Sequence, residues 1–451
     1  MNGGNREQRG NAQLDWDFSS EWDAQLFADL QSGGELLCVD VLGTAFAIRW
    51  GRSVTLEQQH SMRSAWARCA GAGAPLIPPL PKEPTDSLPF TASVAYVSQS
   101  YDGGTFPVQA ASFEELAENV TSRITVAAIL ENAGEFMMLH ACGVASPETG
   151  AVVALVAKSG TGKTTAASVL AGTYGYVSDE TVAIAPDGSI MSYPKPLSVK
   201  QGPGKPKRQV GPDELGLLPT PPKPFIQSIV LLNRVEPDTT AEPDTTEEAH
   251  QEPTLHQLPL ADGLLALIPD SSSQAEIHQP LQSLCRLIDR VGGVWQLTYS
   301  EAADLPQALE PLFRKQRRSK PAWEARGTEE TGQEPELEPV PAGWIRRIPP
   351  QDAVAIDGDL LVMLEAEIVR LSGIGPAIWE ATASALTLEE LAEHVGEVHG
   401  RPEDYRAAVA AAAGQLIAKA VLEQGGDNQD DQPPTAWGTT RSSNPAPMTG
   451  L

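Results

Sequence analysis

The stretch AVVALVAKSGTGKTTAASVL, residues 151–170, determines how the rest of this chain is organised. Its first seven residues form an apolar run with the length and composition of a buried parallel strand. A short segment rich in Gly, Ser and Thr follows, and a helix-forming segment begins near Lys163. Strand, glycine-rich loop and helix in this order indicate a P-loop, and they predict an α/β fold around it.

The loop residues suit the binding of phosphate groups. Gly160 and Gly162 allow successive backbone N–H groups to point at an anion, and the positive end of the following helix adds to the attraction. Lys163 is expected to reach the outer phosphates of ATP, and the Thr164 hydroxyl is expected to bind Mg²⁺. The predicted ATP-binding residues are Ser159, Gly160, Thr161, Gly162, Lys163, Thr164 and Thr165. The alternative is a glycine-rich turn with an exposed lysine.

One position departs from the strict P-loop pattern. Ala157 stands where the pattern has its first glycine. An alanine there requires a negative φ, which the end of a strand usually supplies, so the sequence predicts a tolerated variant of the motif.

Composition and charge exclude several classes of protein. The net charge of −27 argues against nucleic acid and anionic membrane surfaces as general partners. The four cysteines lack C-x-x-C spacing, which indicates a reduced, cytoplasmic protein without a disulfide framework or cysteine metal site. The first residues lack an apolar signal core, and no run approaches the ~18 apolar residues of a membrane span. We therefore expect a soluble cytoplasmic protein.

Changes in composition divide the chain into two domains and three polar segments. We expect a disordered N-terminus, a domain with an N-terminal subregion and a nucleotide-binding core, a linker, a small α+β domain and a disordered tail. The acidic repeat EPDTTAEPDTT, residues 236–246, is expected to be a disordered insertion in the first domain. The respective ranges are 1–34, 35–316 (35–135 and 136–316), 317–342, 343–424 and 425–451.

Three polar residues flank the P-loop in sequence. His140 lies in FMMLHACGVA, which is expected to form one buried strand ending at Ala145, and a lone histidine there suits either the active site or a satisfied core position. Asp179 and Glu180 follow the expected strand end at Tyr176 and Val177, sixteen and seventeen residues after Lys163. Adjacent acids at this position suit metal and nucleophile handling in phosphoryl transfer, or else they form a solvated turn.

A basic stretch follows in this acidic chain. It has no acid between Asp187 and Asp213, and its prolines and glycines predict a loop rather than a helix. The loop suits a role in holding the nucleotide or an acidic substrate segment, and a solvated mobile loop is the alternative. Its basic residues are Lys195, Lys200, Lys205, Lys207 and Arg208.

Other patterns predict further elements. Residues 35–50 are expected to form two strands around Gly43, and 302–314 a helix. Ser112 with Glu115, and Thr387 with Glu390, have the spacing of capping boxes at helix starts.

Residues 36–316 resemble the divergent members of the HPr kinase/phosphorylase superfamily. The resemblance lies in four blocks, LHACGVA, AKSGTGKTT, VSDETVAI and YPKPLSVK. It implies a P-loop kinase core with a mixed sheet that uses ATP and Mg²⁺. It also implies His140 as an active-site residue, Asp179 as the group that orients or deprotonates the acceptor hydroxyl, and Glu180 as its acidic neighbour near Mg²⁺. Thr164 and Asp179 are then the expected Mg²⁺ ligands.

The chain departs from that family after YPKPLSVK. The bifunctional enzymes carry a Glu-Ile-Arg-Gly-Leu-Gly block beyond the kinase core, whereas QGPGKPKRQVGPDELGLLP stands here. Phosphorolysis and HPr as the substrate are therefore not implied. The loop also resembles that of phosphoenolpyruvate carboxykinases, but a carboxylate-binding arginine and a Mn²⁺ ligand set are not recognisable.

Residues 343–424 resemble the PqqD-like family of small winged-helix modules. The resemblance lies in VAIDGDLLVML, GIGPAIWEAT, TLEELAEHV and LIAKAVLEQ. It implies recognition of the leader of a ribosomally made precursor peptide, which adds as a strand to the sheet edge beside the last helix. An unrelated small α+β domain is the alternative.

Together the two resemblances imply a kinase that phosphorylates a Ser or Thr hydroxyl of a precursor peptide. The tethered module would raise the local concentration of the captured peptide, and other peptide-modifying enzymes are further possible partners. Three alternatives stay open: a nucleotide-binding scaffold that presents peptides to another enzyme, a small-molecule kinase, and an HPr-type regulatory kinase. The acceptor and the oligomeric state do not follow from the sequence.

Overall fold

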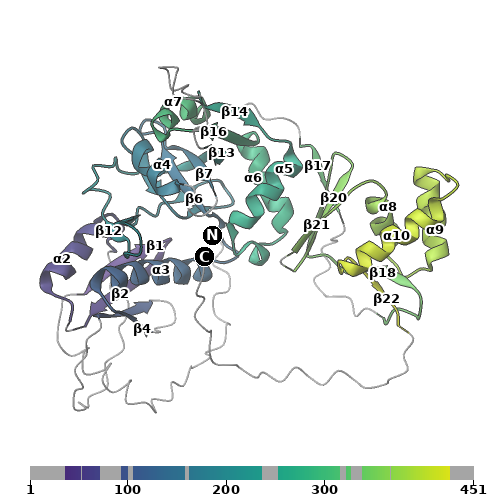
Figure 1. Ribbon diagram of the computed structural model, residues 1–451, viewed down its shortest axis with the longest axis horizontal. Helices are drawn as coiled ribbons and strands as arrows, with labels where there is room; N and C mark the ends of the chain where they lie inside the picture. The colour runs from purple at the N-terminus through teal and green to yellow at the C-terminus, as the bar shows by residue number, and fades with distance from the viewer. Residues whose placement is uncertain are drawn as a thin grey trace, which may run out of the picture. The chain divides into compact units, whose positions relative to one another are not determined.

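The computed structural model divides into two compact units, Met1–Glu324 and Ala325–Leu451, which are described separately (Figure 1). The structure describes residues 36–51, 53–71, 93–99, 105–157, 162–235, 252–314, 321–326, 338–365 and 367–426. The expected disordered N-terminus, the acidic repeat and nearly all of the expected tail lie outside these residues. None of the described helices is long and apolar enough to cross a membrane.

A mixed six-stranded sheet forms the centre of the first unit. β7 and β13 are parallel, as are β13 and β16, whereas β6 runs antiparallel to both β7 and β8. Every residue of β7 is buried, as expected for a strand whose sheet is covered on both faces. The strands, in spatial order, are β14 (Thr254–Gln257), β16 (Val294–Tyr299), β13 (Phe225–Arg234), β7 (Ala151–Val156), β6 (Ala141–Ala145) and β8 (Gly175–Ser178). The predicted α/β fold is thus confirmed in its mixed form.

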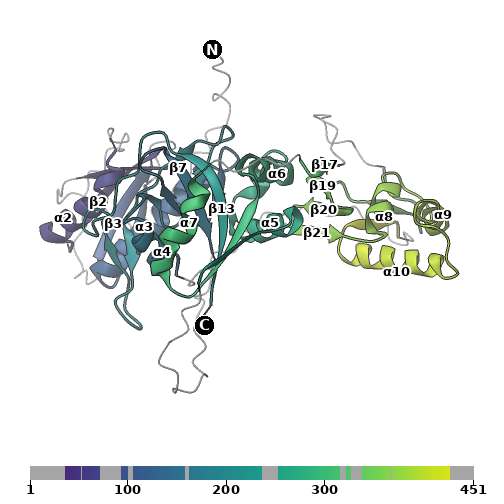
Figure 2. The ribbon, with the colours of Figure 1, turned by 90° about the horizontal axis from the view of Figure 1, so that it is seen from above.

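Helices cover both faces of this sheet. α4 (Lys163–Leu170) and α7 (Leu305–Leu309) lie near each other and pack with Leu155 and Leu297 in one apolar core (Figure 2). α5 (Leu260–Leu267) meets the opposite face, where Gly263 lies against Val294. The lack of a side chain at Gly263 permits this approach, because an added Cβ would lie only 3.0 Å from the Val294 Cβ. α6 (Pro280–Val291) follows and contacts both α5 and β13.

A smaller antiparallel sheet adjoins the first at two bends of the chain. The chain leaves β5 and enters β6 through His140, and it leaves β8 and enters β9 through residues 179–181. The prediction of one continuous strand through FMMLHACGVA was therefore wrong, because β5 pairs with β9 and β15 while β6 pairs with β7 and β8. The small sheet has the order β10 (Ile190–Met191), β9 (Val182–Ile184), β5 (Met137–Leu139) and β15 (Ser271–Ser272).

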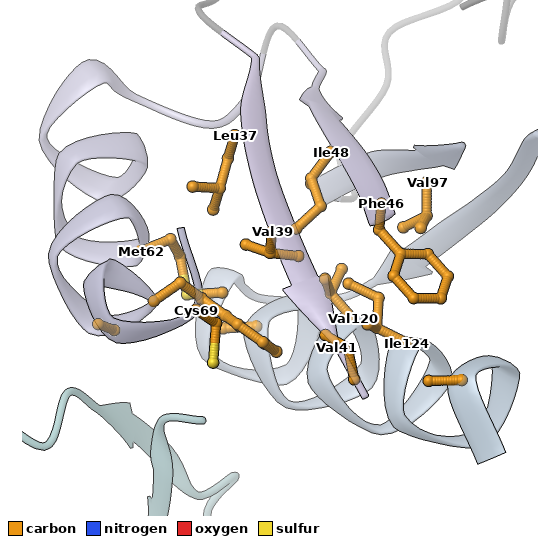
Figure 3. Packing of buried hydrophobic residues seen from close by; sticks show 14 of the residues in the cluster. Leu37, Val39, Val41, Phe46, Ile48, Met62, Cys69, Val97, Val120 and Ile124 are labelled. Atoms are coloured by element: carbon orange, nitrogen blue, oxygen red, sulfur yellow. The ribbon is translucent and has the colours of Figure 1, made fainter. Parts of the chain in front are cut away.

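The N-terminal part forms a separate layer with its own core. Figure 3 shows Val120 and Ile124 of α3 (Phe113–Glu131) pointing toward Val39 and Val41 of β1, with Met62 of α2 (Leu56–Ala65) at the side. The antiparallel sheet above α3 contains the two strands predicted around Gly43, whose φ is 81°. Its strands are β1 (Leu37–Val41), β2 (Thr44–Trp50), β3 (Ser93–Gln99) and β4 (Thr105–Ala110).

Three local predictions are corrected by the structure. Only half of the capping box at α3 forms: the Ser112 hydroxyl accepts from the Glu115 N–H at 3.2 Å, but the Glu115 carboxylate accepts from Ala111. Residues 302–314 form α7 between two 3₁₀ helices instead of one long helix, since Pro306 and Pro311 lack the N–H groups that a helix interior needs. Most of the basic stretch is a β-hairpin, β11 (Leu197–Val199) paired with β12 (Arg208–Val210), whose Leu197 and Val210 are buried.

The second unit is a small α+β fold. Its sheet has the order β17 (Trp323–Ala325), β19 (Asp352–Ile356), β20 (Asp359–Leu364) and β21 (Glu367–Leu371), so part of the expected linker is a strand. β18 (Ile345–Arg347) pairs with β22 (Leu422–Gln424). The Thr387–Glu390 capping box is confirmed. The helices are α8 (Gly375–Ala381), α9 (Leu388–His399) and α10 (Tyr405–Ala418). The predicted α+β class is confirmed, and the PqqD-like assignment stays a prediction.

Two positions on α3 test the core of the N-terminal layer. Ile124 is 0% exposed and Val126 is 53% exposed. We expect Ile124→Ala to lower the free energy of unfolding by about 2–5 kcal/mol through lost burial and a cavity. The matched change Val126→Ala should shift it by less than about 0.5 kcal/mol. Chemical denaturation followed by tryptophan fluorescence measures both, and equal effects would contradict the packing in Figure 3.

Candidate functional site

The topology brings the predicted polar residues to one edge of the central sheet. β7 and β8 both run antiparallel to β6, so the two strands end at the same edge, and β6 begins there. The loop before α4 follows β7, Asp179 and Glu180 follow β8, and His140 precedes β6. Residues that are distant in sequence therefore meet where strands end, which is the usual place for ligand sites in α/β sheets.

The start of α4 has the local geometry that the P-loop pattern predicts. Gly162 is the N-cap with a φ of 102°, a left-handed conformation that favours glycine, and Lys163 begins the helix. Ala157 does not have a positive φ, which agrees with its predicted tolerance at the strand end. Ser159, Gly160 and Thr161 lie outside the described residues.

Lys163 is buried at the base of this loop. Its ammonium group donates a hydrogen bond to the Ala157 carbonyl oxygen. Burial lowers the pKa of Lys163, and the negative charge of Asp270 is the largest effect in the opposite direction. The side chain thus lies between the strand end and nearby acids.

Thr164 and Asp179 are in contact. The Thr164 hydroxyl lies 3.4 Å from Asp179 Oδ2, so the two residues predicted to hold Mg²⁺ converge. A hydroxyl and a carboxylate are hard oxygen donors of the kind that Mg²⁺ prefers, and this cation often takes substrate phosphates as its other ligands. The described residues hold no group of three or more His, Cys, Asp or Glu that would bind a metal ion by themselves. The donor set therefore fits Mg²⁺ shared with a nucleotide. Thr165, the last of the predicted ATP-binding residues, is exposed on α4.

A buried lysine, Lys195, joins Asp179 and Glu180, which we call the acid pair. Lys195 Nζ lies 3.0 Å from Asp179 Oδ1, 3.1 Å from Glu180 Oε2 and 3.2 Å from the Pro196 carbonyl oxygen. The Lys195 side chain is 2% exposed, that of Asp179 3% and that of Glu180 36%. The charge pattern of the sequence groups Lys195 with the other basic residues of the stretch. Its apolar neighbours distinguish it from them, and these are Tyr193, Pro194, Pro196 and Leu197.

These contacts fix the charges of Lys195 and Glu180. Burial alone would lower the pKa of Lys195, but the charges of Asp179 and Glu180 raise it overall. Burial would raise the pKa of Glu180, but Lys195, with a smaller effect of Lys207, lowers it overall. The ammonium group and the Glu180 carboxylate therefore both stay charged at neutral pH.

Tyr176 completes the surroundings of Asp179. Its hydroxyl lies 3.1 Å from Asp179 Oδ1 and 3.2 Å from the Lys195 carbonyl oxygen. Burial, and then the charge of Asp179, raise the pKa of Tyr176, so the hydroxyl stays protonated and donates. Both oxygens of Asp179 thus contact protein donors.

His140 lies at the bend beside the acid pair, and Asp270 supports it. The backbone N–H of His140 donates to the backbone carbonyl oxygen of Asp270 at 2.6 Å, because β15 pairs with β5. Burial and then the charge of Lys163 lower the pKa of His140, so its ring is neutral at pH 7. No nearby sequence motif marked Asp270, since only strand pairing brings it to His140 and Lys163.

Comparisons with known proteins add little to this geometry. No family model matches the chain, and no curated protein matches it. One solved structure, that of the Hpr(Ser) kinase/phosphatase from Coxiella burnetii, is 13% identical over 39% of this chain and 92% of that chain, with a TM-score of 0.18. A TM-score this low carries no weight for fold or function.

Two lysines of the basic stretch test the buried network. Lys195→Met removes the shared partner of two carboxylates, so we expect the free energy of unfolding to fall by about 3–5 kcal/mol. Lys207→Met removes a surface partner of Glu118, 3.4 Å away, and should cost less than about 1 kcal/mol. Adding Asp179→Asn to Lys195→Met should restore part of the loss. Denaturation curves that place both lysine variants within error of each other would contradict the buried contact.

Proposed function

We propose that this chain is an ATP-dependent kinase that phosphorylates a Ser or Thr hydroxyl of a ribosomally made precursor peptide. The observation that carries the kinase part is the contact between Thr164, at the start of α4, and Asp179, at the end of β8. It joins a phosphate-binding helix terminus to an acid that suits a divalent cation.

The nucleotide would bind at the N-terminal end of α4. Backbone N–H groups there are not used within the helix, and the positive helix end favours phosphate. Lys163 would exchange its hydrogen bond to the Ala157 carbonyl oxygen for the outer phosphates of ATP. Mg²⁺ bound near Thr164 and Asp179 would neutralise charge on those phosphates.

The two acids suit different tasks. Asp179 is almost fully buried, and its oxygens already contact Tyr176, Lys195 and Thr164, which supports a role in holding the Mg²⁺ side of the site. Glu180 is the more exposed acid, which supports a place next to the acceptor hydroxyl. The family resemblance implies Asp179 both as a Mg²⁺ ligand and as the residue that orients the acceptor hydroxyl. Here Asp179 keeps the Mg²⁺ role, and the acceptor role passes to Glu180. Neutral His140, half-buried at the same bend, would contribute to orienting the acceptor through hydrogen bonds.

The second unit would capture the leader of the peptide. β21 is the last strand in the order of its sheet, so its outer edge offers backbone groups for an added strand. A leader bound there would stay in the same complex as the kinase site, because the chain links the two units covalently. Its acceptor residue would then meet the kinase site at raised effective concentration.

Charge-neutral replacements of the two acids test both the reaction and the division of roles. The readout is the mass gain of one phosphoryl group on candidate precursor peptides incubated with ATP and Mg²⁺. We expect Glu180→Gln to lower kcat by about 10²-fold or more with an unchanged Mg²⁺ requirement. Asp179→Asn should instead raise the Mg²⁺ concentration needed for half-maximal rate, as well as lowering the rate.

The control for this experiment is Lys163→Ala. It should abolish transfer and weaken ATP binding, with an unchanged circular dichroism spectrum. Wild-type protein that transfers no phosphate to any hydroxyl would refute the kinase proposal. A larger Mg²⁺ effect for Glu180→Gln than for Asp179→Asn would contradict this division of roles.

Truncation tests the proposed capture of the peptide. A chain ending at Glu324 keeps the whole first unit and ends within β17, so only Ala325 of that strand is lost. Trp323, whose Nε1–H donates to Asp289 of α6 at 2.8 Å, is retained. We expect KM for the precursor peptide to rise while KM for ATP and kcat change little, because tethering supplies binding shared by ground and transition states. Adding residues 325–451 as a separate chain should restore little. An unchanged peptide KM would show that the second unit is not the receptor.

A further inference from the structure

The hairpin β11–β12 has a fixed base and an exposed tip. At the base, Leu197 and Val210 are buried, and Gln209 Nε2 donates to Ser198 Oγ at 3.0 Å. The tip, KQGPGK at residues 200–205, is exposed throughout. An added Cβ at Gly202 or Gly204 would meet no atom within 4 Å, so the tip extends into solvent. We call residues 200–205 the basic tip.

The basic residues near the base of the hairpin form ion pairs with acidic side chains, whereas the two lysines of the basic tip do not within the described residues. Lys207 pairs with Glu118 and Arg208 with Glu214, whereas Lys195 pairs with the acid pair. Lys200 and Lys205 have no acidic partner within the described part of the chain. The hairpin register, in which Val199 faces Arg208, also places Lys200 opposite Lys207. Two lysines without an acidic partner therefore lie at the tip of this hairpin, in a protein whose net charge is −27.

The basic tip lies within a short peptide's length of the acid pair. Lys195 contacts Asp179 and Glu180 directly, and five residues later the chain reaches Lys200. Five residues span at most about 18 Å when fully extended. The charge of Lys207, at the same hairpin, also acts on Glu180. An extended peptide whose hydroxyl meets the acid pair would therefore reach the tip within about five residues.

We propose that the basic tip binds acidic side chains of the acceptor peptide, within about five positions of the phosphorylated hydroxyl. This inference rests on the proposed function and specifies its substrate as an acidic sequence. The nucleotide has its own cation in Lys163 and its own helix terminus, so it does not require the tip. A strongly negative chain repels acidic peptides elsewhere on its surface, so a local positive site selects where they bind.

A binding measurement tests the inference without turnover. Two fluorescein-labelled peptides are compared by anisotropy with the full-length protein at low salt: one has a central Ser flanked by Asp residues, and the other has Ala in place of each Asp. We expect the acidic peptide to bind about five- to tenfold more tightly, because each exposed ion pair with Lys200 or Lys205 adds only a modest contribution. The preference should vanish in Lys200→Gln/Lys205→Gln and shrink at high salt.

The matched control is Lys223→Gln/Lys419→Gln, which removes two exposed lysines elsewhere that have no acidic partner within the described residues. This variant should keep the wild-type preference. Equal binding of the two peptides by the wild type, or a preference that survives Lys200→Gln/Lys205→Gln, would overturn the inference. So would a loss of ATP affinity in that variant with the peptide preference intact. If the protein binds the acidic peptide more tightly but transfers no phosphate to any hydroxyl, the kinase proposal is refuted and the recognition of acidic peptides still holds.

Discussion

The buried contact of Lys195 with Asp179 and Glu180 is the interaction on which the rest of the site depends. Removing an ammonium group from water is unfavourable by several kcal/mol unless opposite charges and hydrogen bonds replace the lost hydration. Two carboxylates and the Pro196 carbonyl oxygen supply that replacement here. The end of β8 and the start of the hairpin must therefore meet in one arrangement. That requirement fixes the acid pair relative to the P-loop helix.

The N-terminal layer supports the segment that carries Lys195. Gly211, just after the hairpin, lies so close to α2 that an added Cβ would be 2.8 Å from the Ala65 Cα. Arg68 pairs with Asp213 at 2.7 Å, and the Tyr193 hydroxyl lies 2.7 Å from Thr125 Oγ1 of α3. The two ends of the segment 193–213 are thus held against the layer, whereas residues 200–205 extend into solvent. This gives the layer a structural role in the site, although none of its described residues contacts the acid pair.

The site occupies the place where the chain changes from one sheet to another. A bend between strands leaves side chains without a fixed partner strand, so polar residues there can meet each other and a ligand. His140 and the acid pair both lie at such bends, and Asp270 reaches His140 because β15 pairs with β5. The combination of a phosphate-binding helix terminus with acids at neighbouring strand ends is the chemical basis for the kinase proposal.

The sequence alone determined those local elements that are specified by residues close to one another in the chain. The β7–α4 unit, the negative φ at Ala157, the acids after β8 and the Thr387 capping box all follow from strand composition, glycine placement and capping chemistry. Only the tertiary structure shows that Lys195 is buried against the acid pair while its basic neighbours are not. It also shows that His140 lies between two strands of different sheets, and that Asp270 lies beside it. The burial of a charge and the pairing of distant strands depend on the whole fold. The residues that surround the charge, and the strand that pairs, lie many positions away in the chain, so no local sequence pattern predicts them.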